Sequence, residues 1–518
     1  MAQFVANPRV TFNIVPSENR VGPDDQRALV IGQMTSTGTA TAGALTVDVP
    51  RSDADIDALF GADSHLAMVL RGYRSVNTVT NVDAIALADA SGSTAATAIA
   101  AFSGTATKDG TYYLTVVSDE NHRYQIDVLT GDTAAAVAAK VLALRTADRE
   151  VPFTAAVSTG TVTFTAANKG PIANDWLISL KGSVPGLTCT LTGWTGGATG
   201  PSLTTLWDVV QTLRYQTVIW PSCYDLAKLK AFLDPRKNVE NNIMDGRGFV
   251  YRSVAFGTVK SDAAALDCSE IVILTNEPTS VSGWKGAHLP EAPDVLTAKF
   301  AAARDLRFEP NVSISNVVAT NAANDQFGGI HTASLPYFNT PLIGVGTPLK
   351  GTGYTLDEQR ELEDAGVSIL GVNRAGNGCL TGVVVTTWLN DLAGNPDNTW
   401  KFLEWRDTHG MIREYFQRNC QKQFRQSRLT SGTAVPGYSM VDEATIRAFL
   451  ILLYQELSRV ALTVEGLKAR QYFDDHLVVT LDLANRQVKV AAMIPMVSQL
   501  GQIIGTLEYT FSTDAGNA

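Results

Sequence analysis

The sequence has few of the residues from which metal sites and disulfide frameworks are built. Its 518 residues include only five cysteines and six histidines, and these are widely spaced, with no CxxC pair and no HExxH motif. Structural zinc sites and disulfide frameworks need clustered ligands, so we expect neither. We predict no metal site and five buried free thiols, at Cys189, Cys223, Cys268, Cys379 and Cys420.

Long apolar runs and clustered positive charge are also scarce. The most apolar stretches, residues 446–457 and 491–505, are interrupted by charged, polar or proline residues. Both fall short of the roughly 20 apolar residues that cross a bilayer. The net charge is -10 and no basic run occurs, so we expect neither nucleic-acid binding nor membrane insertion. Residues 1–12 lack the basic and apolar regions of a secretory signal, which predicts synthesis in the cytoplasm.

The motifs of common enzyme classes are missing as well. No GxxxxGK[ST] phosphate loop and no GxSxG nucleophile elbow occurs. The glycine-rich stretches 193–200 and 344–353 lack the lysine and hydroxyl pair, so we interpret them as loops. Cys223 follows a predicted strand, where α/β enzymes place active residues, but no base partner is evident. We therefore predict no catalytic site and no cofactor, and an α/β enzyme using Cys223 or the glycine loops is a less favoured alternative.

The residues that are present indicate a folded protein of several domains. The chain is long enough for two to four domains, and 45% of its residues are hydrophobic while 18% are charged. Helix and strand patterns alternate from residue 203 to about 390, which favours an α/β sandwich. Residues 90–200, which we call the insertion, are rich in Ala, Gly and Thr and contain several short strand patterns and one helix, capped by Asp132. Its borders read as flexible loops.

The last part of the chain combines helices with strands. Residues 399–424 and 442–462 are predicted to form two long helices, and residues 476–497 a hairpin with its turn near Asn485. A further strand, residues 503–511, has apolar residues on one face and is succeeded by small polar residues. Because these small polar residues cannot form a partner strand, residues 503–511 present an edge that invites pairing.

Two short alternating segments carry the residues expected to take part in that pairing. The arm at residues 10–15 alternates apolar and polar side chains, as residues 503–511 do. The predicted pairing residues are Val10, Phe12, Ile14, Ile503, Leu507, Tyr509 and Phe511.

Four segments give the chain a resemblance to the tail sheath proteins of contractile-tailed bacteriophages, especially those of Mu-like phages. They are NPRVTFNIVPSENRVGPDDQRALVIGQ, ALFGADSHLAMVLRGYRSVN, KFLEWRDTHGMIREYFQRNCQKQFRQSRL and IRAFLILLYQELSRVALTVE. The likeness runs in order along nearly the whole chain and is weakest in the insertion. It is a diffuse pattern and not a catalytic signature.

The resemblance implies a structural subunit of the virion. Such a subunit assembles in the host cytoplasm as a homo-oligomer of stacked, hexameric rings around a tail tube protein, next to baseplate and tail terminator proteins. Contraction drives the tube through the host envelope for genome delivery. In the family the terminal arms complete the small sheet of a neighbouring subunit. A sheath of a phage-like bacteriocin or secretion device is an alternative that the sequence does not separate.

The resemblance also implies a domain layout and a surface that faces the tube. The fold class is α+β and α/β, with an α/β sandwich core, an inserted β-rich domain, a C-terminal domain of helices and a small sheet, and extended strand arms. A charged cluster on the first long helix, Arg406, His409 and Arg413, is expected to face solvent or a partner, here the tube. The expected domains are an N-terminal arm (1–25), the first part of the core (26–89), the insertion (90–200), the α/β sheath domain (201–395), the tube-facing domain (396–500) and a C-terminal arm (501–518).

Overall fold

The computed structural model forms two compact units, one of residues 26–410 with 497–498 and one of residues 411–496. The structure describes residues 26–116, 123–148, 151–237, 245–275, 291–308, 335–338, 340–342, 345, 354–372, 378–380, 382–435, 439–484 and 486–498.

The larger unit is built on a sheet with the strand order β15-β14-β13-β12-β11-β1-β3-β2. The strands from β14 to β3 run parallel, and the short outer strands β15 and β2 pair antiparallel. The strands are β1 (Arg27–Gln33), β2 (Leu45–Thr46), β3 (Asn81–Leu87), β11 (Thr217–Ile219), β12 (Arg247–Tyr251), β13 (Ile271–Thr275), β14 (Val367–Val372) and β15 (Gly378–Leu380).

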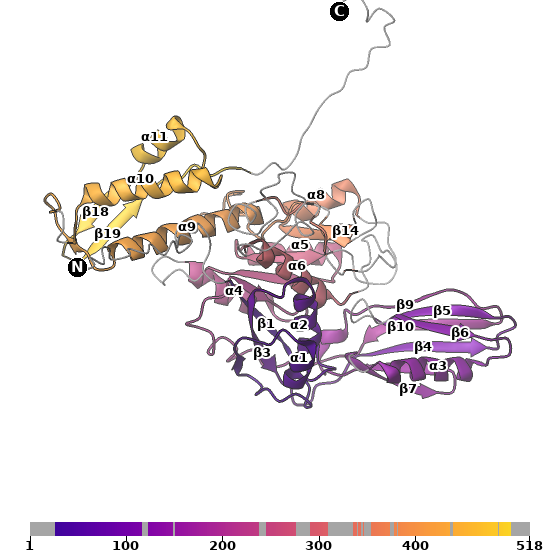
Figure 1. Cartoon of the computed structure of the whole chain (residues 1–518). Coiled ribbons are helices and arrows are strands. Elements are labelled where there is room, and N and C mark those ends of the chain that lie inside the picture. Colours follow the sequence, from indigo (N-terminus) through magenta and orange to yellow (C-terminus); the bar gives the residue numbers. More distant parts are fainter. Residues whose placement is uncertain are drawn as a thin grey trace, which may run out of the picture. The chain divides into compact units, whose positions relative to one another are not determined.

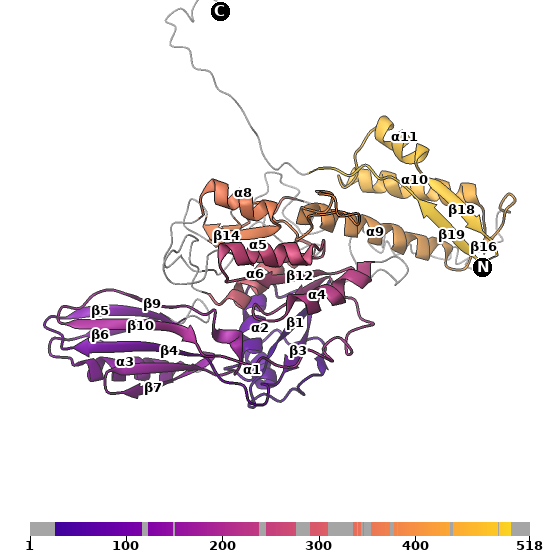
Figure 2. The same ribbon diagram turned by 180° about the vertical axis from the view of Figure 1, so that it is seen from behind.

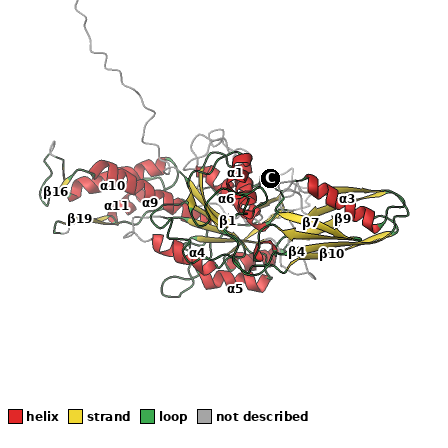
Figure 3. Cartoon of the chain, turned by 90° about the horizontal axis from the view of Figure 1, so that it is seen from below, coloured by secondary structure: helices red, strands yellow, loops and turns green. Residues whose placement is uncertain are grey.

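Helices cover both faces of this sheet, which explains why its central strands are buried throughout. One apolar cluster joins the sheet to α1, α2 and α6, and another joins it to α4, α5 and α8. Figure 3 shows α1 and α6 on one side of the sheet and α4 and α5 on the other. The predicted mixed α/β fold is thereby confirmed. The helices are α1 (Asp53–Phe60), α2 (His65–Val76), α4 (Leu226–Leu233), α5 (Phe256–Leu266), α6 (Pro293–Phe308) and α8 (Leu356–Asp364), with a 3-10 turn η2 (Asp234–Lys237) after α4.

The insertion follows β3 and forms two antiparallel sheets, β10-β4-β8-β7 and β6-β5-β9, with one helix (Figure 1). That helix, α3, begins after Thr133, whose hydroxyl accepts the Ala136 N–H, so the prediction of Asp132 as its cap is wrong. Asp132 instead pairs with Lys140 at 2.6 Å. The elements are β4 (Thr97–Gly104), β5 (Gly110–Val116), β6 (Arg123–Val128), α3 (Ala134–Ala147), β7 (Phe153–Ser158), β8 (Thr161–Ala166), η1 (Pro171–Ala173), β9 (Ile178–Lys181) and β10 (Leu187–Thr195).

The second unit contains the predicted long helices and hairpin (Figure 2). Helix α9 enters this unit at Met411, and α10 buries one apolar face, on which Tyr454 stacks with Phe473 at 4.6 Å. The predicted turn residue Asn485 lies outside the described residues. Searched over the described ranges, no helix is both long and apolar enough to cross a bilayer. The elements are α9 (Leu403–Phe424), β16 (Arg428–Leu429), β17 (Met440–Val441), α10 (Glu443–Arg459), α11 (Leu467–Asp475), β18 (Val478–Asp482) and β19 (Gln487–Ala491).

Candidate functional site

The hairpin of β18 and β19 is the strongest candidate for an interaction surface. Its register pairs Val479 with Val490 and Leu481 with Val488, so these four apolar residues share one face. In the described part of the chain, β18 and β19 form a sheet of two strands. A two-stranded sheet leaves backbone N–H and C=O groups along its outer edges for another strand.

The apolar face of this hairpin is covered unevenly. Val479 on β18, a strand that contacts α10, is 4% exposed, whereas its partner Val490 on β19 is 48% exposed. A strand added beside β19 would extend the sheet and shield Val490 from water. The geometry therefore favours the outer edge of β19 as the place where another strand would pair.

The predicted pairing residues cannot be placed on this edge. All of them, in the N-terminal arm and in the C-terminal strand, lie outside the described residues. Strand donation stays a prediction. The residues concerned are Val10, Phe12, Ile14, Ile503, Leu507, Tyr509 and Phe511.

The charged cluster on α9 differs from the expectation of a helix side that faces solvent or a partner. Arg406 is 3% exposed, and its guanidinium donates two hydrogen bonds to Oε1 of Glu270, at 3.0 and 2.6 Å. Arg406 is thus bonded within its own chain, which corrects the prediction that this residue faces solvent or a partner. His409 and Arg413 are half-buried. The His409 Nδ1 lies 2.9 Å from Nη1 of Arg406, so the buried arginine orients this ring.

Asp407 beside it belongs to the same buried network. Arg304 donates to both carboxylate oxygens of Asp407, at 2.9 and 2.7 Å, and the hydroxyl of Tyr337 donates at 3.0 Å. Burial alone would raise the pKa of Asp407, but Arg304 and Arg247 outweigh it and hold this pKa below its ordinary value. The network fixes the first turns of α9 in the larger unit.

Cys223 follows β11, a position where α/β enzymes place active residues, but its thiol is not in a reactive state. Burial, together with Asp294 and Asp175, raises the pKa of its thiol. The thiolate is the nucleophilic form, so a raised pKa makes the group inert at neutral pH. The adjoining cavity of about 480 Å³ is lined by Arg252 and Asp262, which form an ion pair at 2.7 Å.

The glycine-rich stretches also give no site. Residues 193–200 end β10 and lead into turns rather than into a helix, and a phosphate loop needs a helix N-terminus. Of residues 344–353, only Val345 is described.

One group of potential metal ligands occurs among the described residues, formed by Asp234, Cys268 and Glu270. Its carboxylates are already paired, because Glu270 accepts from Arg406 and Asp234 lies 3.0 Å from Lys230. Burial raises the pKa of the Cys268 thiol, which keeps it protonated and a poor ligand. These residues already have hydrogen-bond or ion-pair partners within the protein and form a structural cluster.

Comparison with known proteins relates the chain to one kind of protein. No family model matches it. It is 26% identical over 504 residues to the Mu-like prophage FluMu tail sheath protein of Haemophilus influenzae, covering 92% of this chain and 94% of that protein. The predicted resemblance is thereby confirmed, and the relationship is to a tail sheath protein rather than to an enzyme, as predicted.

Three solved structures of sheath proteins are similar to this chain at low sequence identity. The sheath tail protein of Desulfitobacterium hafniense is 13% identical with a TM-score of 0.48, over 93% of this chain and 96% of that one. The sheath tail protein of Listeria innocua is 12% identical with a TM-score of 0.46, over 92% of each chain. The contracted helical sheath of the anti-feeding prophage is 12% identical with a TM-score of 0.42, over 99% and 100%. All three scores are below 0.5, so the functional conclusion rests on the sequence relationship.

Proposed function

Because this chain is related over nearly its whole length to a tail sheath protein of a Mu-like prophage, we propose that it is the structural subunit of a contractile phage tail sheath. Copies of the chain stack as hexameric rings around a tail tube protein, between baseplate and tail terminator proteins. Contraction of this lattice drives the tube through the host envelope. The single observation that carries the proposal is the full-length sequence relationship.

The lattice is held together by exchanged strands. Residues 10–15 and 503–511 pair with the hairpin of a neighbouring subunit, and the free edge of β19 with the half-exposed Val490 supports this placement. Each backbone hydrogen bond formed contributes roughly 0.5–1.5 kcal/mol, and each buried apolar side chain roughly 1.5–3 kcal/mol. After the cost of ordering the arm, several kcal/mol remain per contact. Polar segments beside the strands bend while the pairing stays intact.

The face of α9 that carries His409 and Arg413 is proposed to meet the tube. The charged side chain of Arg413 is half-buried, and the side chain of Arg406 holds the ring of His409 in place. Arg406 itself contributes by positioning His409 and not by contact.

Deletion of residues 501–518 tests strand exchange. The truncated protein is expected to remain a folded monomer with an unchanged thermal transition, because only an intermolecular strand is lost, and to form no polymer by sedimentation. A control that lacks only residues 513–518 keeps the strand and should polymerise. If the truncated protein loses the monomer's own thermal transition, the strand pairs within its own chain and the exchange is refuted.

A further inference from the structure

The insertion is bonded to the central sheet beside a topological switch point. The chain runs from β1 to β3 on one side and returns to β11 on the other side of β1, so the strand order reverses between β1 and β11. In open α/β sheets a crevice lies beyond the carboxyl ends of the strands at such a point. The segment between β8 and η1, with Asn168 and Lys169, bonds at the neighbouring carboxyl ends, those of β1 and β3, and to the first residue of α2.

Asn168 makes three hydrogen bonds to three different parts of the α/β sheet domain. Its Oδ1 accepts the backbone N–H of His65, the first residue of α2, at 2.7 Å. Its Nδ2 donates to the carbonyl of Met34, just after β1, at 2.9 Å, and to Oδ1 of Asp89, just after β3, at 3.2 Å. The side chain is 3% exposed, so these bonds are made away from water.

A second group of bonds surrounds this asparagine. Nε2 of Gln33, the last residue of β1, donates to Oδ1 of Asp89 at 2.7 Å and to the carbonyl of Lys169 at 2.8 Å. The Lys169 N–H in turn donates to Oδ2 of Asp89 at 3.0 Å. Asp89 therefore receives bonds from the sheet domain and from the insertion.

The helix that supports Asn168 is itself fixed. Nε2 of His65 lies 2.8 Å from Oδ2 of Asp294 on α6, and Oδ1 of Asp294 accepts the Ser222 N–H at 2.7 Å. Gly32 on β1 leaves room for this ring, because a Cβ there would lie 2.8 Å from Nδ1 of His65. Asp294 of α6 thus holds the residue whose backbone binds the insertion.

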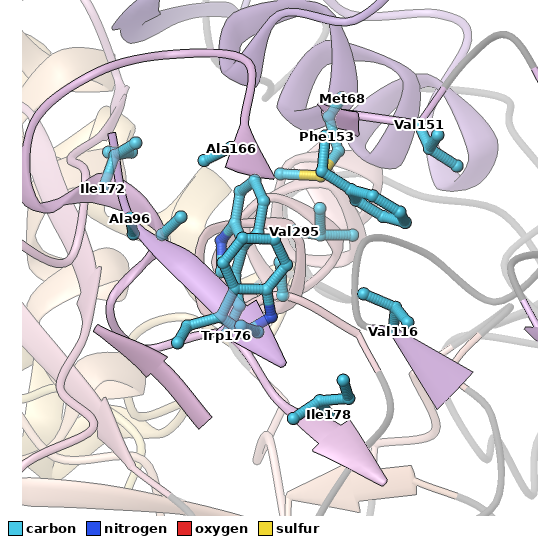
Figure 4. Close-up of a cluster of buried hydrophobic side chains, with 14 of the residues drawn as sticks. Met68, Ala96, Val116, Val151, Phe153, Ala166, Ile172, Trp176, Ile178 and Val295 are labelled. Carbon is cyan, nitrogen blue, oxygen red and sulfur yellow. The ribbon is translucent and has the colours of Figure 1, made fainter. Parts of the chain in front are cut away.

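Apolar contacts also join the insertion to the α/β sheet domain. Figure 4 shows Met68 of α2 and Val295 of α6 in one buried cluster with Phe153 and Trp176 of the insertion. Trp176 also packs edge-on against Trp194 of β10, with ring centroids 5.3 Å apart. The contact between the insertion and the α/β sheet combines a buried apolar cluster with a hydrogen-bonded polar one.

We propose that the carboxyl ends of β1 and β3 form a socket for the insertion and that Asn168 is the residue that locks it there. The insertion and the α/β sheet then move as one body. This inference does not depend on the proposed function.

Hydrogen exchange of the full chain, kept unassembled at low concentration, tests the lock. Asn168→Ala removes all three bonds, so exchange in peptides around residues 34, 65 and 89 should accelerate roughly tenfold or more. Asn174→Ala is a matched control, since its amide bonds only to Gly197 within the insertion, at 2.9 and 3.1 Å. It should accelerate exchange in the insertion and leave those three peptides unchanged.

A second variant keeps the test decisive if Asn168→Ala does not fold. Asp89→Asn retains the size of the side chain but weakens the acceptor shared by Gln33, Asn168 and Lys169, and it should produce the same pattern to a smaller extent. Unchanged exchange at the three peptides in a folded variant at position 168 or 89 would overturn the proposal. Because the measurement uses single subunits, its failure would leave the sheath function standing, and a failure to polymerise would leave the socket standing.

Discussion

The buried carboxyl group of Glu404 makes stability depend on pH. Glu404 is 4% exposed and accepts the Tyr337 N–H at 2.8 Å. Burial raises its pKa from about 4.5 to about 7. The folded protein therefore holds this proton more tightly than the unfolded chain does, and the group contributes stability that is fully present below about pH 4.5 and is lost as pH rises through about 7.

Replacing this residue by Glu404→Gln should remove that dependence. The amide keeps an acceptor for the Tyr337 N–H but cannot ionise, so its free energy of unfolding should fall less than that of the wild type between pH 5 and pH 8. Urea unfolding of both proteins across this range measures the difference. Parallel curves would show that the pKa of Glu404 is the same in the folded protein as in the unfolded chain.

The sequence shows that α9 carries a charged cluster but not that Arg406 and Asp407 are buried. Arg406 and Asp407 look like one side of a solvated helix when only their neighbours in sequence are considered. Their partners, Glu270 and Arg304, lie 136 and 103 residues away in the chain. Local charge pattern carries no information about such distant partners, so the burial of Arg406 could not be predicted.

At the scale of elements, the hairpin offers a matched pair of substitutions. Val490 and Val478 are both about half exposed, at 48% and 56%, but they lie on opposite faces. Val490→Lys places a charge on the apolar face beside the free edge of β19 and should raise the concentration needed for polymer formation at least tenfold. Val478→Lys should have a much smaller effect, and both monomers should unfold as the wild type does.

Sedimentation of both variants over a range of concentrations measures this difference. Equal polymerisation of the two variants would mean that no strand is added beside β19.

Some elements were predictable because their signals are local. Thr355 and Glu358, whose spacing predicts a capping box, form one at the start of α8, with each side chain bonded to the other's backbone N–H.

The pattern of residues 203–215 predicts a helix, but these residues form successive turns, such as the Val210 N–H bonded to the carbonyl of Trp207. The Trp207 ring stacks on Phe232, with ring centroids 3.9 Å apart. Helix α5 is not evident in the sequence because its Gly, Thr and Val residues are poor helix formers.

At the scale of the whole molecule, the order of elements predicts the fold class but not how the insertion joins the sheet. Alternating helices and strands indicated the α/β sandwich, and the change in composition indicated the insertion. The bond from His65 to Asn168 spans 103 residues, so the local sequence around Asn168 carries no sign of its partner. Only the packed structure shows that Asn168 is buried.

Electron microscopy of the purified full-length protein tests whether the chain is a sheath subunit that polymerises. A sheath subunit is expected to form striated tubes or stacked rings without nucleotide or metal, since assembly is attributed to interface contacts. Uniform small particles at high protein concentration would contradict it.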